Sequence, residues 1–189
     1  MRPWNSIKTR RDEVAGLSVN DAPPASVKLG GTTLWAAEPG TLQSGLQELE
    51  AAILESAAVL LAARRSVLKK LVKDGLGGRD LNDKLFSAVL GAVLRSGRMD
   101  SLIAVSANDK PFRVFIHREQ LDRWRRAKET ALSLLKTRKC LSVRELESHI
   151  FEHRTYNTWS SASHVLAHLS YYGIVRLLDD GAARLETFP

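Results

Sequence analysis

The sequence predicts a mainly α-helical chain with small β-hairpins, which places it in the α+β class. Two observations carry this prediction. Apolar residues recur at the three- and four-residue spacing of amphipathic helices in several segments after residue 41. An order of helix, glycine and two short extended segments also occurs twice, about 75 residues apart. We therefore expect an extended N-terminal arm over residues 1–40 and two domains, over 41–120 and 121–189.

The C-terminal domain has the clearer local signals. Ser142 and Glu145 are spaced as a capping box, in which each side chain binds a backbone N–H at the start of a helix. Gly173 stands where a left-handed C-cap is expected after the third helix, and that helix is expected to bury Trp159. The expected helices span 123–138, 143–153 and 159–172, and the expected strands span 174–178 and 183–188.

The domain over 41–120 follows the same plan with a longer first helix. Apolar residues share one helical face from Leu42 onward, so we expect a helix that runs as far as Lys73. Asp80 is a suitable N-cap for the next helix, and Gly97 follows that helix. A helical dimerisation arm followed by a free hairpin is the alternative interpretation. The remaining expected elements are a helix at 81–96 and strands at 101–105 and 112–116.

The N-terminal arm is punctuated by proline and glycine, and only 27–29 and 32–35 suggest a small hairpin. A disordered terminus explains the same composition, so both interpretations stay open. The first part of the arm is basic, as in arms that lie along nucleic acid, through Arg2, Lys8, Arg10 and Arg11.

Three short helices followed by a hairpin, entered from the third helix through Tyr172, Gly173 and Ile174, resemble the winged-helix family of helix-turn-helix domains. The resemblance covers about 67 residues, from Asp122 to Phe188, and depends on the order of the elements and their caps. The middle domain resembles the same family more distantly, so the chain resembles a tandem winged-helix protein. The resemblance implies that the third helix reads the major groove of DNA and that basic residues bind phosphates.

On this resemblance the third helix and the basic residues supply the candidate DNA-binding side chains. The outward face of the helix is expected to carry Ser160, His164 and Tyr171, with His168 beside them and Thr158 at its start. None of these is Arg or Lys, which departs from the commonest guanine-reading chemistry. The two histidines should gain charge below neutral pH and strengthen phosphate binding. Phosphate contacts are expected from Arg123, Arg125, Arg126, Arg154, Arg176 and Arg184.

Charge and apolar patterning indicate the partners. The chain has 28 Lys and Arg against 21 Asp and Glu, a net charge of +7, which favours a polyanion such as double-stranded DNA. The apolar stripe of the long helix and an outward leucine pair on the next helix exceed what one small domain should expose. We therefore expect a homodimer, or a protein partner at the first domain. The residues expected at this interface are Leu42, Leu46, Leu49, Ile53, Leu90 and Leu94.

Signals of enzymatic chemistry are missing from the sequence. It contains no glycine-rich phosphate loop, nucleophile elbow or metalloprotease motif, so we expect no catalytic residues, no cofactor and no enzyme. His149/His153 and His164/His168 are spaced i, i+4, but the pairs differ in phase relative to their core stripes, so no metal site is expected. The lone Cys140 cannot form an internal disulfide and is expected to be partly buried.

Two functional hypotheses follow, both for an intracellular protein, cytoplasmic or nucleoid-associated, with no membrane span. The first is a DNA-binding protein, such as a transcription or replication factor. The alternative is a tandem winged-helix protein-interaction module without direct DNA reading, as in chromosome-segregation, polymerase-associated or membrane-remodelling assemblies. Positive charge favours the first, and the absence of Lys and Arg from the outer faces of both third helices favours the second.

Overall fold

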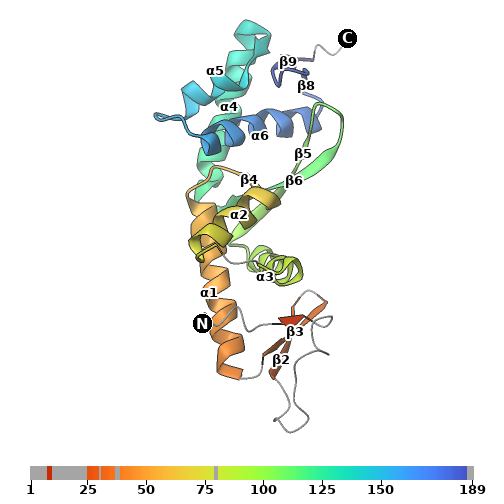
Figure 1. The fold of residues 1–189 in the computed structure, drawn as a ribbon. Coiled ribbons are helices and arrows are strands. Elements are labelled where there is room, and N and C mark those ends of the chain that lie inside the picture. Colours follow the sequence, from red (N-terminus) through yellow and green to blue (C-terminus); the bar gives the residue numbers. More distant parts are fainter. Residues whose placement is uncertain (1–7, 10–24, 30, 37–38, 79–80, 187–189) are drawn as a thin grey trace. The chain divides into compact units, whose positions relative to one another are not determined.

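The structure, a computed structural model, describes residues 8–9, 25–29, 31–36, 39–78 and 81–186. These residues form six α-helices and small antiparallel sheets, so the predicted α+β class is confirmed (Figure 1). The chain divides into two compact units. Unit 1 comprises Met1–Ser56 and Leu68–Arg98, and unit 2 comprises Ala57–Val67 and Met99–Pro189.

Unit 1 contains a sheet with the strand order β1-β3-β2 and most of three helices. Strands β2 and β3 form the small hairpin that the sequence predicts, and α3 contacts both of them. Arg2, Arg10, Arg11 and Asp80 lie outside the described residues. The elements are β1 (Lys8–Thr9), β2 (Ala25–Leu29), β3 (Thr32–Ala36), α1 (Pro39–Ala58), α2 (Arg65–Gly75) and α3 (Asp83–Arg95).

The leucine stripe expected at a dimer or protein interface lies mostly inside the single chain. Strands β1, β2 and β3 contact α3, so part of the surface of that helix is covered within the chain. The prediction that these residues are exposed at an interface is therefore wrong for the buried members of the set. The buried members are Leu42, Leu49, Ile53 and Leu90, and the partly exposed ones are Leu46 and Leu94.

The single helix expected from Leu42 to Lys73 is wrong, because the structure has α1 and α2 with a strand between them. Helix α1 ends at Ala58, and the N–H of Leu60 bonds to the carbonyl of Ala57 at 3.2 Å in the turn that follows. Residues 60–63 are buried, and β4 (Ala63–Arg64) pairs with β6. This long-range strand pairing overrides the helical pattern, since local propensity is only a weak determinant of structure.

Unit 2 contains two three-stranded sheets with the orders β4-β6-β5 and β7-β9-β8, and three helices. In the C-terminal half of the chain, the helices and strands begin and end within a few residues of the expected bounds. In addition to β4, the elements of unit 2 are β5 (Met99–Val105), β6 (Pro111–His117), a 3-10 turn η3 (Arg118–Gln120), α4 (Leu121–Arg138), β7 (Cys140–Leu141), α5 (Val143–Ile150), α6 (Tyr156–Tyr171), β8 (Val175–Leu177) and β9 (Ala183–Leu185).

One order of elements occurs twice along the chain. The series α1-β4-α2-α3-β5-β6 is repeated by α4-β7-α5-α6-β8-β9. In both series the short strand between the first two helices pairs with the last strand, which is the central strand of its sheet. The repeat that the sequence indicates by helix, glycine and hairpin thus includes a further strand that the sequence analysis missed.

The compact units do not coincide with the expected domains over 41–120 and 121–189. The β5–β6 hairpin follows α3 in the sequence but belongs to unit 2, where β5 contacts α6. The segment 57–67 belongs to unit 2 as well, because β4 pairs with β6. The hairpin is therefore not free, as the alternative interpretation held, but is packed on the C-terminal helices.

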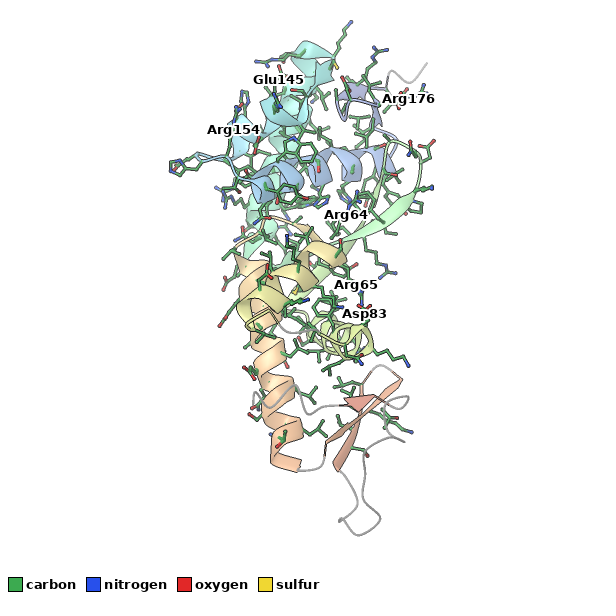
Figure 2. The ribbon with its side chains drawn as sticks, viewed as in Figure 1. Arg64, Arg65, Asp83, Glu145, Arg154 and Arg176 are labelled. Atoms are coloured by element: carbon green, nitrogen blue, oxygen red, sulfur yellow. The ribbon has the colours of Figure 1, made fainter. Side chains whose placement is uncertain are left out.

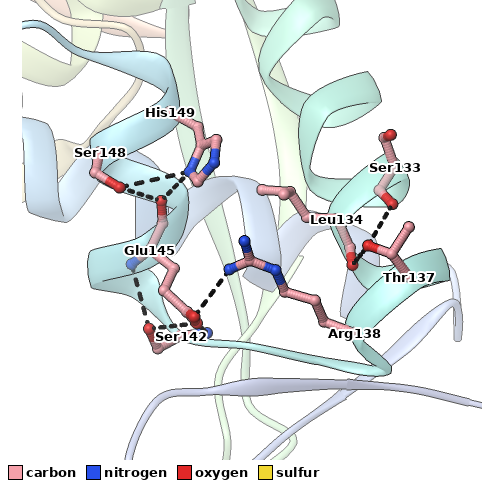
Figure 3. Close-up of polar contacts among 8 residues, drawn as sticks. All are labelled: Ser133, Leu134, Thr137, Arg138, Ser142, Glu145, Ser148 and His149. Atoms are coloured by element: carbon pink, nitrogen blue, oxygen red, sulfur yellow. Dashed lines mark hydrogen bonds and ion pairs between the residues drawn. The ribbon is translucent and has the colours of Figure 1, made fainter.

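The predicted helix caps are present in unit 2. The Ser142 hydroxyl accepts the N–H of Glu145 at 3.2 Å, and the Glu145 carboxylate accepts the N–H of Ser142 at 2.9 Å (Figure 3). Arg138 pairs with the same carboxylate at 3.1 Å. Hydrogen bonds from Ser142, followed by the charge of Arg138, hold the pKa of Glu145 below its usual value. Gly173 has φ +68°, the left-handed cap predicted after α6.

Within the described ranges, no helix has both the length and the apolar character needed to cross a bilayer.

Candidate nucleic-acid interface

Helix α6, whose outward face is expected to read DNA, is covered in the structure. Between residues 161 and 169 only Ser163 escapes full burial. One side of the helix contributes Val165 and Leu169 to the apolar core of unit 2, and β5 contacts the helix as well. His164 and His168 are each 3% exposed, so their predicted place on an outward DNA-reading face is wrong. The hairpin that precedes α4 occupies the surface that a groove-reading helix would need.

Two polar contacts join α6 to the segments that cover it. The Ser161 hydroxyl donates a hydrogen bond to the carbonyl of Ala62 at 3.2 Å, and this pair is buried. The Nδ1 of His168 lies 2.7 Å from the carbonyl oxygen of Ile103 on β5, and it must donate because a carbonyl only accepts. Buried hydrogen bonds of this kind are costly to break without replacement. They therefore hold β5 and the segment at Ala62 in one position against α6.

His164 is an unusual group in this packing. Its ring lies 5.8 Å from the ring of Phe112, centroid to centroid, in a tilted arrangement. Among the described residues its Nδ1 has no hydrogen-bond partner. Burial, followed by the nearby positive charge of Arg64, lowers the pKa of His164 to about 4. His164 is therefore a neutral imidazole near neutral pH, with one ring nitrogen unsatisfied.

His168 is held between aromatic rings. Its centroid lies 5.7 Å from that of Trp124 and 5.1 Å from that of Tyr172. Burial lowers the pKa of His168 as well, although its bond to Ile103 acts in the opposite direction. The expectation that both histidines gain charge just below neutral pH and attract phosphate is therefore wrong, because burial disfavours their charged forms.

The start of α6 is shaped by capping rather than by exposed polar groups. The Thr158 hydroxyl accepts the N–H of Thr155 at 2.6 Å and lies 2.7 Å from the Glu147 carboxylate, so it is already engaged. Ser160 is half-buried. Trp159, expected in the core, is 44% exposed, and so is Tyr171 at the other end of the helix. The exposed groups of α6 thus lie at its two ends.

The C-terminal hairpin carries a row of two arginines, Arg176 on β8 and Arg184 on β9. They are directly paired across the hairpin, and Arg184 is paired with Cys140 on β7 in turn. All three side chains are exposed, so Cys140 is not partly buried as expected. Directly paired side chains share a face with their Cβ atoms about 5 Å apart, so the two like charges repel. Neither arginine forms an ion pair within the described part of the chain.

A second basic group lies at the start of α4 and in the link before α6. Arg125 pairs with Asp122 at 2.9 Å, the guanidinium of Arg123 lies 5.1 Å from the centre of the Phe151 ring, and Arg126 is exposed. Arg154 is exposed three residues after Phe151. The C-terminal end of α5 and the N-terminal end of α6 are thus flanked by positive charge.

The structure does not bring all the predicted basic residues into one patch. Arg154 precedes α6 and Arg176 follows it, so they lie at opposite ends of that helix (Figure 2). A helix of 16 residues is about 24 Å long. The candidate residues therefore form two footprints, the arginine row of the hairpin and the group around Arg123 and Arg154.

Arg64 is a basic residue that is not among those expected to bind DNA. It lies on β4, and its guanidinium lies 3.6 Å from the centre of the Phe112 ring. Burial lowers its pKa, but a guanidinium stays charged at any physiological pH. No local signal could have found it, because the strand forms only by pairing with β6.

Two adjoining hollows lie between the turn of the β5–β6 hairpin and the C-terminal hairpin. The larger is a cleft of about 860 Å³ whose lining includes Arg176 and Arg184. The smaller is a pocket of about 280 Å³ whose lining includes Arg64, Phe112 and His164. They share the lining residues Ser106, Ala107, Leu177 and Asp179, so they adjoin one another.

In the part of the chain that the structure describes, no group of three or more His, Cys, Asp or Glu side chains is placed to hold a metal ion.

Comparison with known proteins gives no family for the chain. No protein-family model matches it, and no curated protein or solved structure matches it either.

Proposed function

We propose that the chain is a tandem winged-helix protein that binds double-stranded DNA through its phosphates, with the C-terminal hairpin as the main contact. The winged-helix assignment is supported by the repeated order of three helices and three strands, and by the equivalent strand orders of the two sheets. Contact between the C-terminal hairpin and the sugar-phosphate backbone fits the general pattern in which phosphate contacts position a protein on DNA.

The observation that carries the proposal is the arginine row. Two exposed arginines in direct register on a hairpin destabilise it slightly, because like charges are paired without an intervening carboxylate. Phosphate oxygens would remove this repulsion, and arginine binds them bidentately. The net charge of +7 acts in the same direction by attracting a polyanion over a longer range.

The burial of α6 defines what kind of DNA binding is proposed. Since the middle of the helix is covered by β5, base-specific reading by His164 or His168 is not part of the proposal. Binding of this kind depends weakly on sequence and strongly on salt, because it releases condensed counterions.

A salt titration tests the proposal. Affinity for a random-sequence duplex should fall linearly with the logarithm of salt concentration, with a slope near −0.9 for each phosphate contacted. Replacing Arg176 or Arg184 by Gln should flatten the slope by about one unit each. Arg95→Gln is the matched control, since it removes the same charge from an exposed arginine of α3 in unit 1. Absence of binding to duplex DNA at about 50 mM salt would refute the proposal.

A second candidate function, binding of another protein, is favoured by a different observation. Ile103 is 38% exposed, Tyr171 44% and Tyr172 60%, and His168 touches both Ile103 and Tyr172. Exposed aromatic residues beside an apolar one are typical of the centre of a protein interface. The same titration separates the two functions, because an interaction module without DNA contacts leaves the random duplex unbound.

A further inference from the structure

The pocket of about 280 Å³ in unit 2 has no role in the phosphate contacts proposed above. Its walls come from β4, β6, α6 and the turn of the C-terminal hairpin, through residues that are far apart in the sequence. Its volume is just below the range of about 300–1,000 Å³ that is usual for pockets that take drug-sized ligands. One small flat group fits such a space, and a DNA duplex does not.

One wall of the pocket is cationic and aromatic. Arg64 lies over the face of Phe112 at 3.6 Å from its centre, so the guanidinium is fixed in orientation. Within the described ranges Arg64 has no carboxylate partner, and its charge remains available to an anion. A guanidinium held in this way is suited to one phosphate group.

The floor of the pocket offers an unsatisfied hydrogen-bonding atom. His164 is 3% exposed, lines the pocket and has no partner for its Nδ1 among the described residues. Buried polar atoms are nearly always paired, because leaving one unpaired costs free energy. A ligand that reached this nitrogen with a hydrogen-bonding edge would supply the missing partner.

The lining of the pocket also includes an exposed ring and two acids. Trp159 lines the pocket and is 44% exposed, which makes it available for stacking. Asp179 and Asp180 line the pocket as well, and Asp180 already accepts the N–H of Ala182 at 2.9 Å. The acids disfavour a phosphate on their side but accept hydrogen bonds from amino groups.

These features together fit one nucleotide. We propose that the pocket receives a single unpaired nucleotide of bound DNA, with its base against Trp159, its edge toward His164 and its phosphate at Arg64. Since the pocket adjoins the cleft whose lining includes Arg176 and Arg184, a strand held at the arginine row lies near the pocket. This inference rests on the proposed function and narrows its substrate class to duplexes that contain an unpaired base.

The test compares two DNA probes of one sequence. One is a blunt random duplex, and the other carries one extra unpaired adenine in its middle, replaced by fluorescent 2-aminopurine for a second readout. Base–aromatic stacking predicts that the full-length protein binds the bulged duplex at least about fivefold more tightly. Stacking on Trp159 should also quench the 2-aminopurine fluorescence on binding.

Two variants assign the effect to the pocket. Trp159→Ala should remove the preference and the quenching while leaving affinity for the blunt duplex unchanged, and Arg64→Gln should reduce the preference. Tyr171→Ala is the matched control, because Tyr171 has the same 44% exposure on the same helix but does not line the pocket. It should keep both the preference and the quenching.

The outcomes separate this inference from the proposed function. Binding of both probes with equal affinity overturns the nucleotide pocket and leaves phosphate binding standing. Loss of the preference in Tyr171→Ala but not in Trp159→Ala overturns the pocket as well. Binding of neither probe refutes the proposed function, and the pocket inference with it.

Discussion

Acid should destabilise unit 2 through His164, and the sign of this effect follows from the direction of its pKa shift. Burial lowers the pKa of this group to about 4 from an ordinary value of 6.5. The unfolded chain therefore binds a proton more tightly than the folded protein does. The stability from keeping His164 neutral is fully present above about pH 6.5 and is lost as the pH falls toward about 4.

The size of the effect follows from the same two pKa values. Between about pH 7.5 and about pH 5, linkage gives a loss of about 2 kcal/mol in the free energy of unfolding from His164 alone. His168 adds a loss in the same direction, because burial lowers its pKa too. Glu145 contributes little to the change in the free energy of unfolding in this window. Its pKa lies below its ordinary value, so the carboxylate takes up a proton only at lower pH.

The assay is urea unfolding followed by circular dichroism at the two pH values. His164→Phe keeps a ring beside Phe112 but cannot titrate, so its loss of stability on acidification should be smaller than that of the wild type by about 2 kcal/mol. His153→Phe, at an exposed position, should behave as the wild type. Equal pH dependence of the wild type and His164→Phe would refute the reasoning.

Three further predictions concern stability. Ser142→Ala should lower the free energy of unfolding by about 0.5–2 kcal/mol by removing the cap of α5, whereas Ser133→Ala, on an exposed turn of α4, should change it little; thermal melting compares the two. Gly173→Ala should destabilise by about 1 kcal/mol, because φ is +68° there; no change in urea midpoint would mean the backbone relaxes. Leu49→Ala should lower the free energy of unfolding by about 2–5 kcal/mol without altering the sedimentation coefficient. A change in oligomeric state would show that Leu49 lies at an interface between chains.

The elements that the sequence predicted well are those with local causes. The capping pair Ser142 and Glu145, the left-handed Gly173 and the hairpins are determined by groups within a few residues of one another. Their physical reasons act in a short peptide as well as in the folded chain, which is why they can be read without tertiary structure.

The features that escaped the sequence have non-local causes. Strand β4 interrupts an apolar helical pattern only because β6 pairs with it about 50 residues later. His164 and His168 have the polar character of a groove-reading face, and nothing near them in the sequence indicates that β5 covers it. Arg64, in a run of basic residues, gives no sign that its guanidinium stacks on Phe112. The exposed arginines of the C-terminal hairpin were therefore predictable, because a strand and turn pattern local to residues 174–188 places them.

The interleaving of the two units constrains how the protein can be dissected. Residues 57–67 belong to unit 2 but are encoded between the two segments of unit 1, so no single cut releases either unit whole. A fragment that starts at residue 121 would lose β4, β5 and β6, and with them the partners of Ser161 and His168. Its α6 would present a bare face to any nucleic acid offered to it. Binding measured on that fragment would describe a surface that the intact chain keeps covered.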